Sequence, residues 1–307
     1  MPSTSNCDES KLVPKPKHER RVKQPTPNWL ELPRDVMENI LQRIGVVDVL
    51  ENTQKVCTAW REIYKDPAMW KVIHMHKFLV PNGKRAFQEM CKHAVDRSQG
   101  QLLDLTIKGF CDEGLLQYVF ERSSQLRRVE IIFCLENIFE QWGEGLKNLP
   151  LLEELSVGDI STEDIEAAGR YCPLLKTLKV NQAKIMLLYP DDDADDDGYW
   201  EDLIQNEIAL AIGKNLPRLT HLELIRNSMN NNGLRAILDG CRHLESLDLR
   251  GCEYLDLKRD LGKRCSRQIK DLKLPHDYLS GHRKYMLYGH SHCDDHTPMF
   301  GRPLCRT

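Results

Sequence analysis

A motif that recurs seven times constrains the fold of this chain more than any other feature. It has the form Leu-x-x-Leu-x-Leu, with Ile or Val replacing some leucines, and it begins at Leu102, Leu126, Leu152, Leu175, Leu219, Leu244 and Ile269. The first positions are 23 to 26 residues apart, except for one step of 44. Apolar residues at alternate positions predict a short strand, and the stretches that follow, such as 162–171, have helical spacing. Because one such unit cannot bury its own apolar side, we expect the units to stack around a continuous core.

Apolar residues precede several of these motifs at a fixed position. Cys172 and Cys241 stand three residues before the leading leucine, and Leu149 and Leu216 hold the same place in other units. The motif and its cysteines resemble the cysteine-containing kind of leucine-rich repeat. The resemblance implies an α/β solenoid of about seven repeats of about 25 residues over 100–275. Cysteine is a small apolar filler in such places, and we expect that role for Cys57, Cys172, Cys241 and Cys252.

The composition narrows the class of protein further. The chain has 307 residues, a net charge of -3 and an odd number of cysteines, 11. Its length is sufficient for two domains, and its small net charge gives no overall attraction to nucleic acid or to a membrane surface. No secretory segment and no apolar run near 18 residues is present, so we expect neither secretion nor a membrane span. We expect free thiols in a reducing compartment.

A second apolar pattern precedes the repeats, at 26–76. Val36, Ile40 and Ile44 share one helical face, and Pro33 occupies a position that tolerates proline in a first turn. We expect Asp48 to cap a second helix, with a glutamate three residues later completing a capping box. Three helices of roughly 45 residues cannot bury this much apolar and aromatic surface among themselves, since domains of that size are marginal alone. The pattern therefore predicts a partner.

These residues resemble an F-box. The match comprises the opening Leu-Pro, the Ile-Leu-x-x-Ile face, the Val-Cys-x-x-Trp-Arg segment and a late tryptophan. In that family the module docks on a Skp-type linker protein, which is bound in turn to a cullin. The resemblance implies that the core and the docking face consist of Leu32, Pro33, Ile40, Leu41, Ile44, Val56, Cys57, Trp60 and Trp70. The sequence does not divide them between these two roles. An ordinary three-helix cap on a larger domain is the alternative interpretation.

A connecting segment, 77–99, joins the two modules. Residues 84–97 have an amphipathic helical pattern, and a terminal repeat needs a cap, so we expect this helix to close the solenoid and to hold the F-box against it. The segment from Ala94 to Gly100 resembles plant F-box/leucine-rich-repeat proteins in particular.

The polar residues inside each strand motif are candidates for substrate binding. Leucines that point into the core leave the intervening residues on the opposite, concave face of the sheet. These residues form two columns of mixed charge without aromatic side chains, which favours a folded protein surface or a charged peptide as the ligand. The substrate-binding candidates are Arg128, Glu130, Glu154, Lys179, His221, Glu223 and Asp248. A solvated sheet face, with the true contacts on loops, is the alternative.

Two patterns resemble metal sites, and we expect neither to bind a metal or cofactor. An acidic insertion near 186–205 contains Asp193-x-Asp195-x-Asp197-Gly198, which matches the start of an EF-hand loop. The twelfth position is Ile204 rather than glutamate, so we expect a solvated acidic loop. The tail from 276 to 307 has histidines and cysteines at ligand-like spacing but no Cys-x-x-Cys pair, and we expect it to be irregular.

The remaining segment is a proline-containing, basic tail at 1–25, which we expect to be disordered. A basic run of this kind can act as a nuclear-import signal, so we expect the protein in the nucleus, the cytoplasm or both.

Together these patterns predict a substrate-recognition adaptor of a Skp-cullin-F-box type ubiquitin ligase, with a protein substrate that the sequence does not identify. The chain contains no phosphate-binding glycine-rich loop, nucleophile elbow or His-Glu-x-x-His motif, so we expect a non-catalytic subunit. Nucleic-acid binding is not expected, because the basic cluster lies in the tail and the sheet face is mixed in sign. The alternative is a leucine-rich-repeat interaction scaffold unconnected to ubiquitination.

Overall fold

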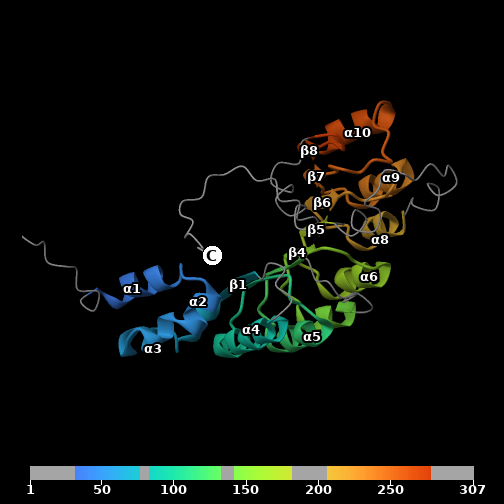
Figure 1. The fold of residues 1–307 in the computed structure, drawn as a ribbon. Coiled ribbons are helices and arrows are strands. Elements are labelled where there is room, and N and C mark those ends of the chain that lie inside the picture. Colours follow the sequence, from blue (N-terminus) through green and yellow to red (C-terminus); the bar gives the residue numbers. More distant parts are fainter. Residues whose placement is uncertain (1–31, 77–82, 133–141, 182–205, 278–307) are drawn as a thin grey trace, which may run out of the picture.

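The computed structural model describes residues 32–76, 83–132, 142–181 and 206–277. Within these ranges, eight parallel strands form one sheet whose strand order follows the chain. The sheet lines the inner side of a curved stack (Figure 1). Its strands are β1 Val72–His76, β2 Asp104–Lys108, β3 Arg128–Ile132, β4 Glu154–Val157, β5 Thr177–Asn181, β6 His221–Ile225, β7 Ser246–Asp248 and β8 Asp271–Lys273.

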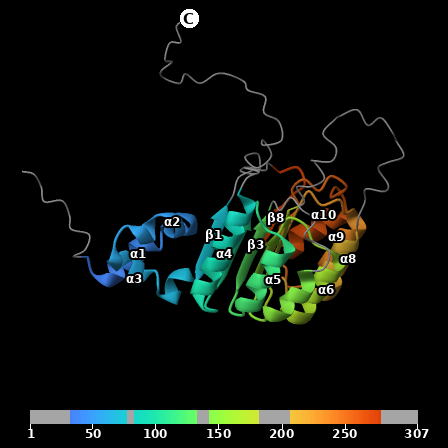
Figure 2. The same cartoon turned by 60° about the horizontal axis from the view of Figure 1, so that its bottom comes forward.

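Helices cover the outer side of this sheet, and a separate group of short helices lies at its β1 end (Figures 1 and 2). The outer helices are α4 Lys84–Ser98, α5 Glu113–Arg122, the 3₁₀ helix η4 Trp142–Asn148, α6 Thr162–Tyr171, α8 Glu207–Asn215, α9 Asn231–Gly240 and α10 Asp260–Gln268. The short helices are α1 Arg34–Leu41, α2 Val46–Glu51, η2 Thr53–Lys55, α3 Thr58–Ile63 and η3 Pro67–Trp70. We call residues 32–71 the helical module.

The register of the sheet follows the repeated motif. The first intervening residues pair in sequence from Asp104 to Asp271, and the leucine-type positions beside them, such as Leu105, Val129 and Leu155, also face one another. Those apolar side chains are almost fully buried between the sheet and the helices. The intervening side chains are therefore left together on the inner face of the sheet.

The sheet begins one strand earlier than the seven motifs indicate. Residues 72–76 form β1, which pairs with β2 from Val72↔Asp104 onward, although they were expected to belong to the F-box pattern at 26–76. Trp70, Ile73 and Met75 have the spacing of the motif and are all buried. A tryptophan stands in the leucine position, and the step from Trp70 to Leu102 is longer than the usual 23 to 26 residues, which conceals this unit in the sequence.

Local signals for helix ends are accurate in one place and misleading in another. Ser161 and Asp164 form a complete capping box at the start of α6. The predicted capping box at Asp48 is wrong, because α2 already begins at Val46, after Gly45, and Asp48 lies inside the helix. The two apolar residues Val46 and Val49, both buried, draw this turn into the helix.

The buried cysteines fill the ends of the units. Cys172 and Cys241 lie near main-chain carbonyl oxygens of the preceding unit, and burial raises the pKa of their thiols to about 12 and about 11. Cys252 is equally enclosed, whereas Cys57 is only half-buried. The described cysteines form no disulfide. Burial in an apolar surrounding makes such thiols structural rather than reactive.

Some expectations concern residues outside the described ranges. These are the basic tail at 1–25, the acidic insertion with its EF-hand-like start, and the histidine- and cysteine-containing tail. Within the described ranges, no group of three potential ligands is placed to hold a metal ion. Of the helices in those ranges, none has the length and apolar character needed to cross a bilayer.

Candidate functional site

The helical module has a core of its own, tied together by hydrogen bonds. The hydroxyl of Tyr64 donates to the carbonyl oxygen of Leu41 at 3.1 Å, and the indole Nε1 of Trp70 donates to the carbonyl oxygen of Tyr64 at 2.9 Å. The rings of Tyr64 and Trp70 are 6.1 Å apart, a separation at which aromatic pairs attract. All three residues are buried. These contacts link the end of α1 to η3, immediately before β1.

A second set of contacts joins the helical module to the sheet. The guanidinium of Arg97, on α4, lies 5.1 Å above the Trp70 ring and donates to the side-chain oxygen of Gln54 at 2.9 Å. α4 also contacts α2 and η3, and α2 contacts β1. Because Trp70 belongs both to the core of the module and to the first β unit, the two parts share one buried junction.

The structure divides the nine predicted F-box residues between core and surface. Leu41 is fully buried and Trp70 is 2% exposed, so neither offers surface to another protein. Pro33 and Val56 are exposed. The partly buried members of the set are Leu32, Ile40, Ile44, Cys57 and Trp60. Sequence reasoning could not make this division, because helical spacing identifies an apolar face but not what covers it.

Apolar side chains remain uncovered on this module within the described chain. Val56 is 62% exposed and Val36 is 41% exposed. Partly buried apolar residues packed against the same core add to this surface: Leu32, Ile44, Val47, Leu50, Trp60 and Met69. Apolar surface gathered on so small a unit is typical of a protein-binding face.

The inner face of the sheet carries a ladder of ion pairs. Arg128 is its centre: its guanidinium lies 3.0 Å from Asp104, 2.6 Å from Glu130 and 3.5 Å from Glu154. Lys108 pairs with Glu130 at 2.7 Å, and Lys179 pairs with Glu154 at 2.6 Å. We call these six residues the inner-face ladder. Three cations and three carboxylates thus neutralise one another across β2 to β5.

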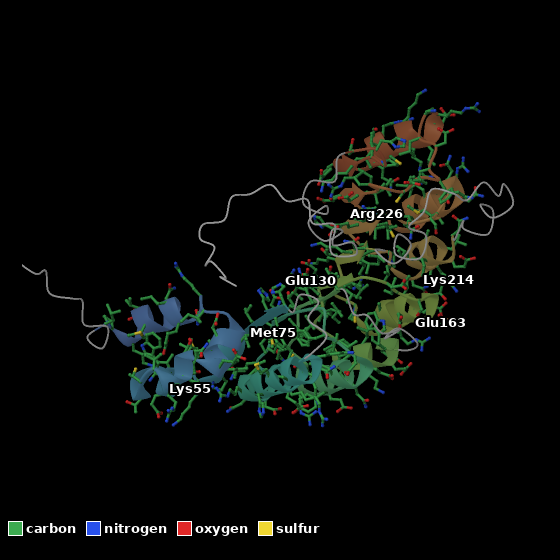
Figure 3. The ribbon with its side chains drawn as sticks, viewed as in Figure 1. Lys55, Met75, Glu130, Glu163, Lys214 and Arg226 are labelled. Atoms are coloured by element: carbon green, nitrogen blue, oxygen red, sulfur yellow. The ribbon has the colours of Figure 1, made fainter. Side chains whose placement is uncertain are left out.

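The pKa of Glu130 shows that the ladder stabilises its charged groups. Burial alone would raise the pKa of Glu130, but hydrogen bonds from Lys108 and Arg128 outweigh it, and the pKa lies below its usual value. The Glu130 side chain lies on the inner side of the stack, whereas Glu163 and Lys214 lie on the outer side (Figure 3). Because its pKa is lowered, the ionised form of Glu130 is stabilised by the fold.

A smaller cluster follows on β7 and β8. Arg250 and Lys273 pair with Asp248 at 2.6 Å and 3.2 Å, and the Asp248 side chain is 5% exposed. Burial would raise the pKa of Asp248, but these partners lower it overall. His221 is exposed and lies 2.8 Å from the hydroxyl of its neighbour Thr220, measured from Nδ1. Glu223 is half-buried on the same face.

The structure therefore separates the seven substrate-binding candidates. Five take part in ion pairs on the sheet face: Arg128, Glu130, Glu154, Lys179 and Asp248. Sequence reasoning missed two of their partners, Lys108 and Arg250. The signal was available, because each follows a column residue by two positions and so lies on the same face of the sheet.

The chain is similar to known proteins over its helical module and over most of its full length. The F-box domain model matches residues 29–71. F-box protein SKIP19 of Arabidopsis thaliana is 41% identical over 254 residues, which cover 82% of this chain and 78% of that protein. "Putative F-box/LRR-repeat protein 21" of the same plant is 40% identical over 256 residues, with 81% and 82% covered. "Putative F-box/LRR-repeat protein 9" is 36% identical over 243 residues, with 77% and 92% covered.

Among solved structures, the tropomodulin C-terminal domain of Caenorhabditis elegans matches with a TM-score of 0.33 and 15% identity, over 51% of this chain and 92% of that domain. This similarity is too low to establish a shared fold.

Proposed function

This chain belongs to the family of F-box/LRR-repeat proteins, and on that basis we propose that it is the substrate-recognition adaptor of a Skp-cullin-F-box type ubiquitin ligase. The helical module docks on a Skp-type linker protein, which carries a cullin, and the strand-and-helix stack binds a protein substrate. The chain itself makes and breaks no bonds. The matched F-box model and the names of the relatives support this general role.

The observation that carries the proposal is the uncovered apolar surface of the helical module. Val56 and Val36 are exposed, and further apolar residues of the same module are only partly buried against its core, although hydrogen bonds tie that core together. Covering this surface removes apolar area from water, which contributes about 25 cal/mol of favourable free energy per Å² before the cost of association is subtracted. A linker protein would provide that cover.

The contribution of such an adaptor to catalysis is positional. Holding a substrate lysine near a charged conjugating enzyme converts an encounter between free molecules into an effectively intramolecular reaction. This requires a stiff connection between the two binding ends. The junction around Trp70, with Arg97 packed above it, supplies one, because the same side chain is buried in the helical module and in the first β unit.

The proposal is tested by measuring binding of the purified full chain to a Skp-type linker protein. Replacing Leu32 and Pro33 together by alanine should weaken binding tens-fold or more, by about 2 kcal/mol, as truncation of interface anchors typically does. Val56→Asp should weaken it as well, and this exposed position leaves the core intact.

The matched control is Leu210→Asp, since Leu210 lies on α8 and is 51% exposed. It introduces the same charge into a similarly exposed apolar position far from the helical module. Unchanged linker binding by the Leu32/Pro33 and Val56 variants would contradict the proposal and would favour an interaction scaffold unconnected to ubiquitination.

A further inference from the structure

A groove of about 580 Å³ lies at the edge of the sheet where the chain enters β5 to β8. Its walls are four successive helix-to-strand connections, 173–176, 218–220, 242–245 and 268–270. Main-chain hydrogen bonds hold these connections in register: Thr220 donates to Lys176, Glu245 to Thr220, and Lys270 to Glu245, each at 2.8 to 2.9 Å. The groove is therefore a built feature of four neighbouring units. We call it the rim groove.

The charged side chains that line the rim groove are mostly basic. Lys176, Arg218, Arg242 and Lys270 all contribute to it, together with His243, and the acidic residue among the lining side chains is Glu245. All six are exposed. The protein as a whole has a net charge of -3, so this concentration of positive charge is local and runs against the overall balance.

Three of these cations are not neutralised within the described residues. Lys176, Arg218 and Arg242 form no ion pair there, although the Arg218 guanidinium donates to the carbonyl oxygen of Pro173 at 3.1 Å, across the groove wall. Lys270 pairs with Glu245 at 3.3 Å, but both side chains are mostly exposed, and such pairs contribute little. A negatively charged ligand would thus meet cations whose charge is still available.

We propose that the rim groove binds an extended acidic peptide segment of the substrate; the identity of that protein as a substrate rests on the function proposed above. Neighbouring strands are about 4.8 Å apart, so cations from β5 to β8 extend over about 15 Å. An extended peptide advances about 3.3 Å per residue. Carboxylates spread over about five residues match this distribution of charge.

Two other ligands fit less well. A single phosphate group needs cations that converge on one point, whereas Lys176, Arg218 and Arg242 come from three different connections. Single-stranded nucleic acid usually needs large aromatic side chains on which its bases stack, and the described lining contains no phenylalanine, tyrosine or tryptophan. Half-exposed Leu174 instead offers an apolar contact to a peptide side chain.

The experiment measures fluorescence anisotropy of labelled eight-residue peptides with the purified full chain. The probe alternates glutamate and serine. One comparison peptide has glutamine in place of glutamate, and another carries one phosphoserine in the glutamine background. The groove variant combines Lys176→Glu, Arg218→Glu and Arg242→Glu. The control variant combines Lys147→Glu, Lys214→Glu and Arg235→Glu, which lie on outer helices and change the net charge equally.

The glutamate peptide should bind the wild type about tenfold more tightly than the glutamine peptide, and the groove variant should lose about tenfold or more while the control variant changes less than about twofold. Equal loss in both variants, preference for the phosphoserine peptide, or displacement by a short oligothymidylate at lower concentration would overturn the inference. Failure of the glutamate peptide to bind would overturn it as well.

Linker binding, measured on the same preparations, separates this inference from the proposed function. Absent peptide binding with intact linker binding would overturn the groove alone. Peptide binding without linker binding would support the groove and contradict the ligase role. Unfolding curves of both variants show whether the reversals leave the fold intact.

Discussion

The inner face of the sheet and the rim groove are both rich in charge, yet their charges are in opposite states. On the inner face, Arg128 lies within 3.5 Å of three carboxylates, and the ladder is neutral as a whole. In the groove, Lys176, Arg218 and Arg242 have no acidic partner within the described residues, and they stay exposed. The charges of the first region are paired with one another within the fold, whereas those of the second remain available for a ligand.

This contrast shows that a charged column in a sequence does not by itself mark a binding surface. Parallel strands bring the same motif position of neighbouring units to about 4.8 Å. Opposite charges at those positions therefore form ion pairs with each other in the free protein. In the connections the compensation is incomplete: Lys270 pairs with Glu245, whereas Lys176, Arg218 and Arg242 form no ion pair within the described residues.

The largest effect is expected from Arg128→Ala. This substitution leaves Asp104, Glu130 and Glu154 close together without their shared cation, and removing one partner of a buried pair is strongly destabilising. Because the Arg128 side chain is partly exposed, we expect a loss of about 2 kcal/mol in the free energy of unfolding, measured with urea at pH 7. A loss no larger than that of Arg242→Ala would remove the distinction between the two regions.

A smaller effect with a defined pH dependence is expected from Glu130→Gln. The folded-state pKa of Glu130 is lowered, so its contribution is fully present above the unfolded pKa, near 4.5, and is lost as the pH falls through the folded value. We expect about 1 kcal/mol less stability at pH 7. The difference from wild type should disappear well below pH 4.5. A difference that stays constant down to pH 3 would contradict the ladder.

The smallest effect on stability is expected in the rim groove. Lys176→Ala and Arg218→Ala should each change the free energy of unfolding by less than about 0.5 kcal/mol, as is usual for exposed positions without strong contacts. Urea unfolding of both variants, beside Arg128→Ala, measures the contrast directly. A loss above about 1 kcal/mol in either would mean that these cations support the fold.

The inner face can still be tested as a binding surface if the ladder is left intact. His221 and Glu223 stand outside it, so His221→Ala combined with Glu223→Ala should leave stability within about 0.5 kcal/mol of wild type. A change in substrate affinity of this double variant would then be due to lost contacts on the inner face. Reversing the charge of Arg128 or Lys179 would lower the stability of the fold as well as any substrate affinity, so the two effects could not be separated.

Much of the architecture was predictable, because it depends on local periodicity. The seven motifs coincide with β2 to β8, and 162–171 is the range of α6. β1 escaped detection because Trp70 takes the place of a leucine and the following step is long. The false cap at Asp48 arose because a capping pattern was considered without the buried valines that extend the helix past it.

The sequence by itself determined the repeated unit, the register of its polar columns and the family, since each depends on residue types at regular spacing along the chain. Only the tertiary structure decided which of nine F-box residues reach the surface, which charges are already paired, and that Trp70 serves two modules. Most of those properties depend on distances between side chains that are 20 or more residues apart, such as Arg128 and Glu154, and the order of residues in a sequence carries no such distance.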